Sequence, residues 1–314
     1  MSAVAGSLRG RSFTKLADWS RSELAAVLDL ADDLKQARRE GDQQLLLAGR
    51  AVGLLFLKPS TRTRVSFAAG IAQLGGTALS FSAEELHLAR GETIRDTAVV
   101  LSRYLDALVV RTFAQDDVEE LALHASIPVV NALTDAAHPC QILADLMTIR
   151  ERRGRLEGLT LVYLGDGNNV CASLLVGAAT FGMHVLAATP AGYAPPEQAV
   201  ATARERATAS GGSVEVTTDA HAAVVGADVL YTDVWTSMGQ EAENERRRRD
   251  LAGYGIDDEL LREAGGQALV LHCLPAHYGE EITEEIVYGP QSAVFDEAEN
   301  RLHTQKALLA LIVR

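Results

Sequence analysis

Cysteine is scarce in this chain of 314 residues, with one residue each at Cys140, Cys171 and Cys273. The three lie far apart, no CxxC pair occurs, and an odd count does not suit a disulfide framework. This composition favours a reducing compartment, and we expect the protein in the cytoplasm. Long apolar runs are also missing, since none approaches the ~20 residues of a membrane-spanning helix. The N-terminus has no apolar core typical of a secretory signal, so neither membrane insertion nor secretion is predicted.

Positive charge is also in deficit. Lysine and arginine total 29 against 42 aspartates and glutamates, which gives a formal net charge of −13. Such a chain repels nucleic acid and anionic lipid surfaces, so neither is expected as a partner. Hydrophobic residues make up 47% and charged residues 23%, which is typical of a folded globular protein and excludes global disorder. At roughly 150 residues per domain, the length predicts two domains.

Short apolar segments alternate with helical patterns through the first half of the chain. Ser20 and Glu23 form a capping box that predicts an amphipathic helix through about Gln36. Buried strands between helices are typical of a parallel sheet that is covered on both faces. The predicted strands are Ala51–Leu57, Ala78–Phe81, Ala107–Val110 and Pro128–Asn131, and the predicted helices are about Thr61–Leu74, Thr93–Tyr104, Asp116–His124 and His138–Arg150.

A charged stretch at Arg150–Arg155 separates this half from a second series of strands and helices. The order predicts two doubly wound parallel-sheet α/β domains, with residues 1–148 in the first and 149–297 in the second. The last helix is expected at about Glu299–Val313. The strands predicted for the second domain are Leu159–Leu164, His184–Ala188, Ser213–Thr217, Val229–Thr232 and Ala268–Leu271, with a final strand near Ala293–Phe295.

A cationic loop follows the first predicted strand. Residues 58–64, Lys-Pro-Ser-Thr-Arg-Thr-Arg, carry three cations and no acid. Ser60 or Thr61 is expected to cap the next helix, whose free N–H groups suit a phosphate together with the nearby hydroxyl and guanidinium groups. The loop lacks the G-x-x-x-x-G-K pattern of a nucleotide-binding loop, and an ordinary helix cap with exposed arginines is the alternative. Arg111 ends another strand at the same sheet edge and fits a second phosphate clamp.

Ser60-Thr61-Arg62-Thr63-Arg64 resembles the carbamoyl-phosphate signature of the aspartate/ornithine carbamoyltransferase family. Later motifs extend the resemblance nearly end to end, and one of them, D-x-W-x-S-M-G, matches the ornithine-binding loop of this family. The later motifs are His138-Pro139-Cys140-Gln141, Gly165-Asp166-Gly167-Asn168-Asn169, Asp233-Val234-Trp235-Thr236-Ser237-Met238-Gly239, His272-Cys273-Leu274-Pro275 and Glu299-Asn300-Arg301-Leu302-His303.

The resemblance implies a carbamoyl-phosphate site. His138 and Gln141 would face the carbamoyl group, whose carbonyl a neutral imidazole could polarise by donating a hydrogen bond. Arg301 would reach the same group, which requires the helix within 298–314 to pack back onto the first domain. The implied binding set is Ser60, Thr61, Arg62, Thr63, Arg111, His138, Gln141, the Leu274 carbonyl and Arg301, and the implied catalytic residues are Arg62, His138, Cys273 and Arg301.

The resemblance also implies an amino-acid site. A carboxylate at a strand end suits an ammonium group, although a lone aspartate there is more often a turn or cap residue. Asn168 is the less favoured alternative to Asn169. The turn at 165–169 superficially resembles a dinucleotide-binding loop, but Val170 stands where that pattern needs a small residue. The implied ornithine ligands are Asn169, Asp233, Ser237, Met238 and Cys273.

Four further features of the sequence add no residue to these sites. A Cys–His catalytic pair at Cys273 is disfavoured because neighbouring residues of a strand point to opposite faces. The four arginines within Glu241–Asp250 predict a solvated helical face in a candidate lid. Glu84 stands where members of the family commonly have Gln, Lys or Arg, and a glutamate near phosphate is repulsive. His277 matches no role in the family.

The resemblance implies carbamoyl transfer from carbamoyl phosphate to the δ-amino group of L-ornithine, which gives L-citrulline and phosphate without a metal or organic cofactor. It also implies a homotrimer, or a multiple of trimers, with active sites at subunit interfaces. Transfer to putrescine or N-acylornithine is a second hypothesis that the Asp233 loop disfavours. A non-catalytic binding protein for amino acids or carbamoyl phosphate is a third hypothesis, and an NAD-dependent dehydrogenase is a fourth.

Overall fold

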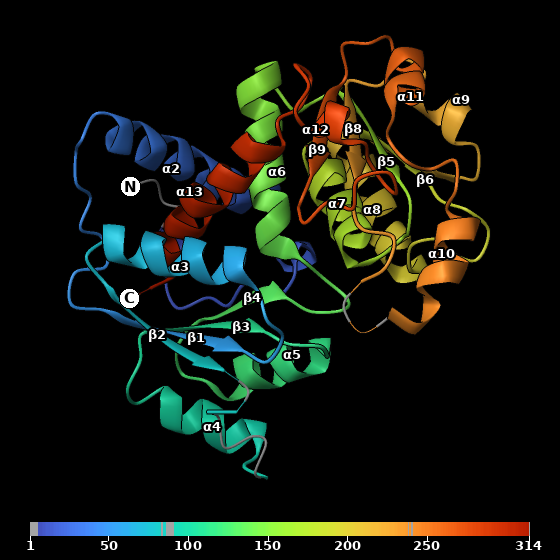
Figure 1. Ribbon diagram of the computed structural model, residues 1–314. Coiled ribbons are helices and arrows are strands. Elements are labelled where there is room, and N and C mark those ends of the chain that lie inside the picture. The colour runs from blue at the N-terminus through green and yellow to red at the C-terminus, as the bar shows by residue number, and fades with distance from the viewer. Residues whose placement is uncertain (1–5, 83, 86–90, 238, 240, 314) are drawn as a thin grey trace. The chain divides into compact units, whose positions relative to one another are not determined.

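The computed structural model describes residues 6–82, 84–85, 91–237, 239 and 241–313. It divides into two compact units, of which unit 1 contains Met1–Met147 with Glu299–Arg314 and unit 2 contains Thr148–Ala298. Each unit has its own parallel sheet flanked by helices (Figure 1), so the predicted fold class is confirmed. Within the described residues, no helix combines the length and the apolar character that crossing a membrane requires.

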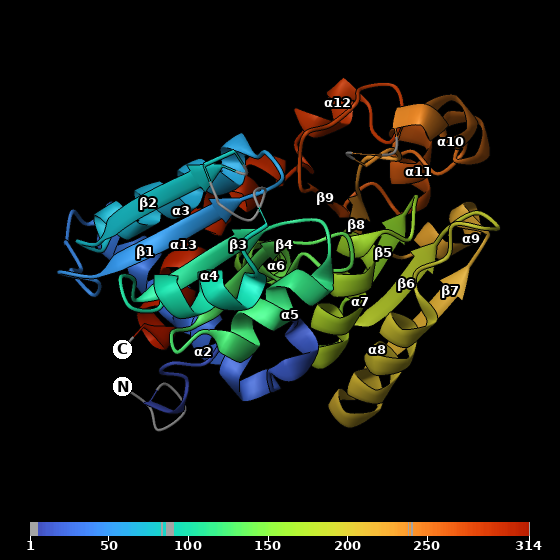
Figure 2. The same cartoon turned by 90° about the horizontal axis from the view of Figure 1, so that it is seen from below.

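Unit 1 contains four parallel strands in the order β2 (Thr77–Ser82), β1 (Ala51–Phe56), β3 (Ala107–Arg111) and β4 (Val129–Leu133). Helices α4 (Ile94–Leu101) and α5 (Gln115–His124) cover one face of this sheet. The other face carries α2 (Arg21–Arg39), α3 (Thr61–Gln73) and α13 (Val294–Ile312), as Figures 1 and 2 show from two directions. The remaining elements of this half are η1 (Leu16–Asp18) and α6 (Pro139–Arg153).

Local sequence explains where these helices begin. α2 starts at the predicted capping box, in which Ser20 accepts from the Glu23 amide and Glu23 accepts from the Ser20 amide. Thr93 caps α4 by accepting a hydrogen bond from the Asp96 amide. Such caps satisfy amides that would otherwise lack a partner at the helix N-terminus.

The C-terminal helix packs on unit 1, as predicted. Lys35 of α2 donates to Asn300 of α13 at 2.7 Å, and this contact is buried. Lys306 donates to Gln73 at the end of α3 at 3.3 Å. A Cβ atom at Gly70 would lie 3.0 Å from Lys306 Cγ, which is tighter than an ordinary contact, so glycine suits the close approach of α3 and α13.

The strand predicted at Ala78–Phe81 is present, but the prediction that it is buried is wrong. The strand forms as β2, but it is the outermost strand and has a neighbour on one side only. Leu79 is consequently exposed, and Ala78 and Phe81 are only half-buried. Apolar composition identified the strand correctly but does not distinguish an edge position from a central one.

Unit 2 contains five parallel strands in the order β7 (Ser213–Thr217), β6 (His184–Ala188), β5 (Thr160–Leu164), β8 (Val229–Thr232) and β9 (Leu269–His272). A hydrophobic core joins this sheet to α9 (Ala220–Val224), α11 (Asp258–Glu263) and α12 (Glu284–Val287). The remaining elements are α7 (Asn169–Thr180), α8 (Glu197–Ser210), η3 (Glu241–Glu243) and α10 (Asn244–Asp250).

The strand predicted near Ala293–Phe295 is wrong. Ser292 makes one isolated bridge to Val270, and α13 begins at Val294. Valine and phenylalanine favour a strand, but Asp296 and Glu297 follow in the first turn, where acids stabilise a helix N-terminus. Val294 still reaches the core of unit 2, and it does so from the helix.

Candidate active site

The predicted phosphate loop lies between β1 and α3. Ser60 is the N-cap of α3, and its hydroxyl oxygen accepts a hydrogen bond from the Thr63 amide at 3.2 Å. The amides of Leu57 and Lys58 both donate to the Arg111 carbonyl, which ties the loop to the end of β3. A capped helix N-terminus next to the end of a neighbouring strand is the geometry that an anion site needs.

A buried cluster of basic side chains lies beside this loop. Arg111, His138 and Arg301 are 8%, 4% and 4% exposed, and Arg301 Nη2 donates to Thr63 Oγ1 at 2.6 Å. Burial, followed by the charges of Arg301 and Arg111, holds the pKa of His138 well below its ordinary value. His138 is therefore neutral near pH 7 and can donate a hydrogen bond to a carbonyl oxygen.

The other predicted carbamoyl-phosphate residues of unit 1 differ in exposure. Thr61 and Arg62 are exposed at the start of α3, so the structure does not gather their side chains into the buried cluster. Gln141 is buried in the first turn of α6, where its side-chain Nε2 donates to Asp145 Oδ1 at 2.8 Å. Lys58, also from this loop, pairs with Asp135 at 2.7 Å.

Cys140 has a structural environment. Its thiol is buried and donates to the Asn131 carbonyl at 3.3 Å. Burial raises the pKa of this thiol to about 12, with the charge of Arg301 acting in the opposite direction. Cys140 is therefore an unreactive core residue within the His138–Gln141 motif.

The predicted amino-acid site in unit 2 centres on Asp233, which follows β8 and is 5% exposed. Its Oδ1 accepts a hydrogen bond from the Cys273 thiol at 3.0 Å, and its Oδ2 accepts from Asn168 Nδ2 at 2.7 Å. Three segments after β5, β8 and β9 therefore meet at one carboxylate. A carboxylate at the carboxyl ends of parallel strands is where the fold predicts a ligand.

The two asparagines of the turn before α7 differ in their local roles. Asn168 is the N-cap of α7, and its Oδ1 accepts from the Val170 and Cys171 amides. Its side-chain amide also holds Asp233, so this residue has a structural task. Asn169 begins α7 and is half-buried. The assignment of Asn169 to the substrate stays a prediction.

Ser237 is half-buried in the segment that follows Asp233, and its predicted contact with the substrate is not tested. Met238 lies outside the described residues. Leu86, His87 and Leu88, which align Glu84 with the family, also lie outside them. Glu84 itself is exposed.

The space beside Gly167 is filled by the chain itself. The Gly167 amide donates to the Tyr193 carbonyl at 2.8 Å. A Cβ atom at Gly167 would come within 2.3 Å of the Pro195 nitrogen. In a dinucleotide-binding turn the second glycine lets the backbone approach the pyrophosphate, so this geometry opposes the dehydrogenase hypothesis.

The backbone at Leu274 is held in an uncommon conformation. Its φ is +58°, and its amide donates to His272 Nδ1 at 2.9 Å. His272 Nε2 contacts Glu281 Oε1 at 3.2 Å, and both side chains are 0% exposed. The His277 amide donates to the same Glu281 oxygen at 2.5 Å. Because His272 Nδ1 accepts this hydrogen bond from the Leu274 amide, the ring proton is on Nε2. Among the described contacts, no hydrogen bond joins His272 to the Cys273 thiol.

Glu281 was not predicted from the sequence, because a glutamate nine residues after a motif histidine carries no local signal. Arg247 was predicted to lie on a solvated face with Arg246, Arg248 and Arg249. Those three are exposed as predicted, but Arg247 is buried and pairs with Asp166 at 2.7 Å. The prediction is wrong for Arg247 because composition does not show which side of a short helix faces the core.

Two groups of side chains in the described chain have metal-like composition: Asp233, His272 and Cys273, and His277, Glu280 and Glu281. In the first group, both ring nitrogens of His272 already have partners, and the Cys273 thiol donates a hydrogen bond to Asp233. In the second, Glu280 is paired with Arg248. A metal would have to displace these contacts, so neither group resembles a prepared metal site.

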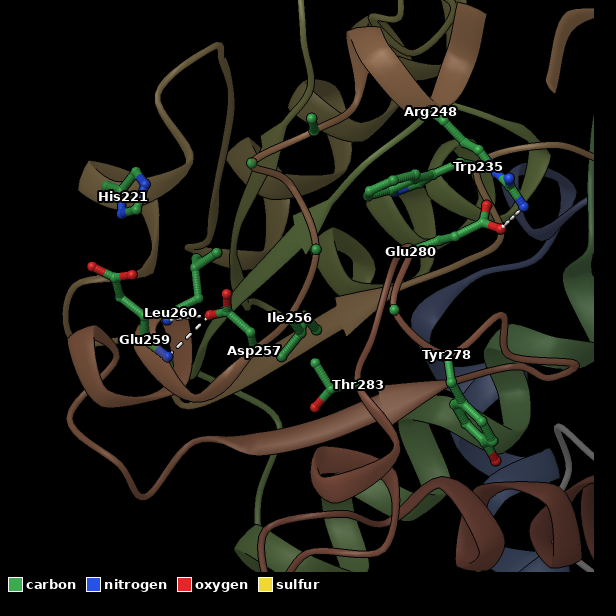
Figure 3. Close-up of a pocket in the computed structure, with 14 residues that line it drawn as sticks. His221, Trp235, Arg248, Ile256, Asp257, Glu259, Leu260, Tyr278, Glu280 and Thr283 are labelled. Atoms are coloured by element: carbon green, nitrogen blue, oxygen red, sulfur yellow. Dashed lines mark hydrogen bonds and ion pairs between the residues drawn. The ribbon is translucent and has the colours of Figure 1, made fainter. Parts of the chain in front are cut away.

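A pocket of about 700 Å³ opens in unit 2 beside Trp235 (Figure 3). Its walls include Ile256 and Leu260, together with Arg248 and Glu280, which form an ion pair. Among the described residues predicted to bind ornithine, which are Asn169, Asp233, Ser237 and Cys273, none lines this pocket. The pocket is therefore a separate feature from the Asp233 cluster.

Known proteins resemble this chain over nearly its whole length. Residues 11–151 match the model of the aspartate/ornithine carbamoyltransferase carbamoyl-P binding domain, and residues 157–312 match that of the Asp/Orn binding domain. An ornithine carbamoyltransferase from Symbiobacterium thermophilum is 56% identical over 98% of this chain and 99% of its own. Another from Acidothermus cellulolyticus is 56% identical over 96% of each.

A solved structure agrees with these sequence matches. Ornithine carbamoyltransferase from Pyrococcus furiosus superimposes with a TM-score of 0.95 at 48% identity, over 98% of both chains. The family models together match more than half of this chain, in the same order as its two units. The chain therefore belongs to the aspartate/ornithine carbamoyltransferase family.

Proposed function

We propose that this chain transfers the carbamoyl group of carbamoyl phosphate to the δ-amino group of L-ornithine, giving L-citrulline and phosphate. The observation that carries the proposal is the Asp233 cluster within a D-x-W-x-S-M-G loop, in a chain 56% identical to ornithine carbamoyltransferases. A buried carboxylate with a thiol and an amide as neighbours suits the ammonium group of a free amino acid. The aspartate-specific relatives need basic groups here for a second substrate carboxylate.

Unit 1 supplies the proposed carbamoyl-phosphate residues. Arg62, His138 and Arg301 polarise the carbonyl oxygen and stabilise the charge that develops on it. Gln141 and the Leu274 carbonyl are assigned to the carbamoyl amide. The neutral state of His138 supports this role, because the ring then donates one hydrogen bond without adding charge. The residues assigned to the phosphate are Ser60, Thr61, Arg62, Thr63 and Arg111.

Unit 2 supplies the proposed ornithine residues. Asp233 and Ser237 bind the α-amino group, and Asn169 with the Met238 amide binds the α-carboxylate. Cys273 lies near the δ-amine. Its hydrogen bond to Asp233 supports a place for the thiol in the amino-acid site, beside the carboxylate assigned to the α-amino group.

The reaction needs no covalent intermediate with the protein. The neutral δ-amine attacks the carbonyl carbon of carbamoyl phosphate and forms a tetrahedral intermediate. A carbon–nitrogen bond forms, the carbon–oxygen bond to phosphate breaks, and the amine loses a proton. The protein's tasks are to position the two substrates and to stabilise the oxyanion and the leaving phosphate.

Family membership also supports three proposals about context. We place the reaction in arginine biosynthesis and the protein in the cytoplasm, and we propose a homotrimer or a multiple of trimers with interface active sites. Sedimentation equilibrium measures the mass of the assembly. A stable monomer that is fully active would contradict the interface active site.

A citrulline assay with a panel of amines tests the activity. Ornithine, putrescine and N-acetylornithine are supplied at equal concentration with carbamoyl phosphate. We expect citrulline from ornithine and at least about a hundredfold lower carbamoylation of the other two, because each lacks part of the free α-amino acid that Asp233 binds. Absence of citrulline from ornithine would refute the proposal.

A further inference from the structure

Arg247 makes four contacts that no proposed catalytic step uses. The side chain is 8% exposed, and its Nη1 donates to Asp166 Oδ2 at 2.7 Å and to the Trp235 carbonyl at 3.1 Å. Its Nε donates to Glu243 Oε2 at 3.0 Å. The guanidinium carbon also lies 5.4 Å from the centroid of the Tyr193 ring. One planar group therefore has directional contacts with four segments of unit 2.

Two of these contacts reach the loops that carry the proposed ornithine ligands. Asp166 belongs to the turn after β5, two residues before Asn168, whose amide holds Asp233. Trp235 belongs to the segment that begins at Asp233 and leads to Ser237. The Arg247 Nη1 group donates to both segments, so it fixes the separation of the two loops.

We infer that Arg247 is a positioning residue for the amino-acid substrate, which holds the turn after β5 and the loop after β8 in the register that ornithine binding needs. This inference rests on the proposed function and deepens it. Arg247 has no contact with Asp233 or Cys273 among the described contacts, so it acts through Asp166 and Trp235. Its partner in this role is Asp166.

The charge balance of the site supports the pairing. Burial raises the pKa of Asp166, and the neighbouring Asp233 raises it further, whereas the Arg247 charge lowers it. Loss of the guanidinium leaves a buried carboxylate next to Asp233 without its main counterion. A lysine retains the charge but cannot reproduce the planar fork, in which Nη1 donates to Asp166 and Trp235 while Nε donates to Glu243.

The test compares Arg247→Met, Arg247→Lys and Asp166→Asn with Arg249→Met, a matched control in the same helix whose side chain is exposed. KM is measured separately for ornithine and for carbamoyl phosphate. We expect the three variants to raise KM for ornithine by about ten- to a hundredfold, since small displacements of binding groups have effects of this size. KM for carbamoyl phosphate should change by less than about threefold, and Arg249→Met should match the wild type.

Hydrogen–deuterium exchange gives a second readout that does not depend on activity. In Arg247→Met, we expect faster exchange in both 165–172 and 229–237, with the wild-type rate in the sheet of unit 1. Folded Arg247→Met and Asp166→Asn proteins with an unchanged KM for ornithine would overturn the inference. An equal rise in both KM values, or faster exchange in α10 alone, would also overturn it. If the wild type makes no citrulline, the proposed function fails, while the exchange result still reports whether Arg247 holds the two loops.

Discussion

The proposed phosphate site of unit 1 and the proposed amino-acid site of unit 2 are built with opposite charge and by different means. Around His138 the neighbouring charges are Arg111 and Arg301, and the Ser60 cap marks the N-terminus of α3. Around Asp233 the neighbours are a thiol, an amide and a second carboxylate at Asp166. The first arrangement suits an anion and the second suits an ammonium group.

This difference explains how an acidic chain can serve two oppositely charged ligands. The overall charge of −13 opposes a phosphate, so the positive groups must be concentrated where they act. The same overall charge agrees with a cationic amino acid. The two sites should therefore fail in different ways when one charge is removed from each.

The largest effect is expected for Arg62→Ala. This side chain is exposed at the start of α3 and is assigned to both the phosphate and the carbonyl oxygen. Losing a group that stabilises both charges should lower kcat by about 10³-fold, because one such donor alone is worth ~10²–10³. Steady-state kinetics measure this loss. Arg64→Ala is the control, since Arg64 stacks on Phe56 at 5.2 Å, and it should lose less than about tenfold. A folded Arg62→Ala protein with near-wild-type turnover would remove Arg62 from the site.

Asp233→Asn should act on the other substrate. The amide keeps the shape of the side chain but loses the charge that pairs with the α-ammonium group. We expect KM for ornithine to rise about a hundredfold, with little change in KM for carbamoyl phosphate. Initial rates over a grid of both substrate concentrations separate the two constants. An equal change in both would contradict the division between the sites.

Thiol reactivity should separate Cys273 from the other two cysteines. Burial raises the pKa of Cys140 to about 12 and raises that of Cys171 well above its ordinary value, whereas Cys273 is half-buried. Iodoacetamide should therefore modify Cys273 at least about tenfold faster than the others. Peptide mass spectrometry follows the three rates, and Cys273→Ser removes the fast phase. Comparable rates at all three cysteines would show that the core of each unit opens readily.

The smallest effect concerns the pH dependence of stability. Because the pKa of His138 is lowered in the folded protein, its contribution is fully present above the ordinary value of 6.5 and is lost as pH falls below it. Between pH 7.5 and 5.5, the wild type should lose more free energy of unfolding than His138→Asn does. Binding of one proton changes the free energy of unfolding by at most about 1.4 kcal/mol per pH unit. Chemical denaturation at both pH values measures this loss in the two proteins. An equal loss in the wild type and in His138→Asn would indicate that His138 is protonated in the folded state.

Much of the fold was predictable because buried parallel strands are continuous apolar runs between capped helices. Local signals sufficed for the α2 capping box and for the cap at Ser60. The edge position of β2 was not predictable, because composition does not reveal how many neighbours a strand has. The segment at Ala293–Phe295 was ambiguous, since β-favouring residues there precede the acids of a helix start.

The motif residues of the proposed site could be named as candidates from the sequence, whereas the residues that contact them could not. Arg247 pairs with Asp166, which is far from it in sequence. Glu281 contacts His272 from a loop that has no sequence pattern. Periodicity and motif matching describe a residue by its neighbours along the chain, whereas burial and pairing depend on the folded arrangement. Supporting residues of this kind therefore require the structure.

Direct binding of carbamoyl phosphate in the absence of ornithine tests the division between the two sites most directly. Isothermal titration calorimetry is applied to the wild type, to Arg301→Met in unit 1 and to Asp233→Asn in unit 2. We predict that Asp233→Asn binds carbamoyl phosphate within about twofold of the wild type and that Arg301→Met binds at least about tenfold more weakly. Wild-type affinity in Arg301→Met, or an equal loss in both variants, would contradict the account.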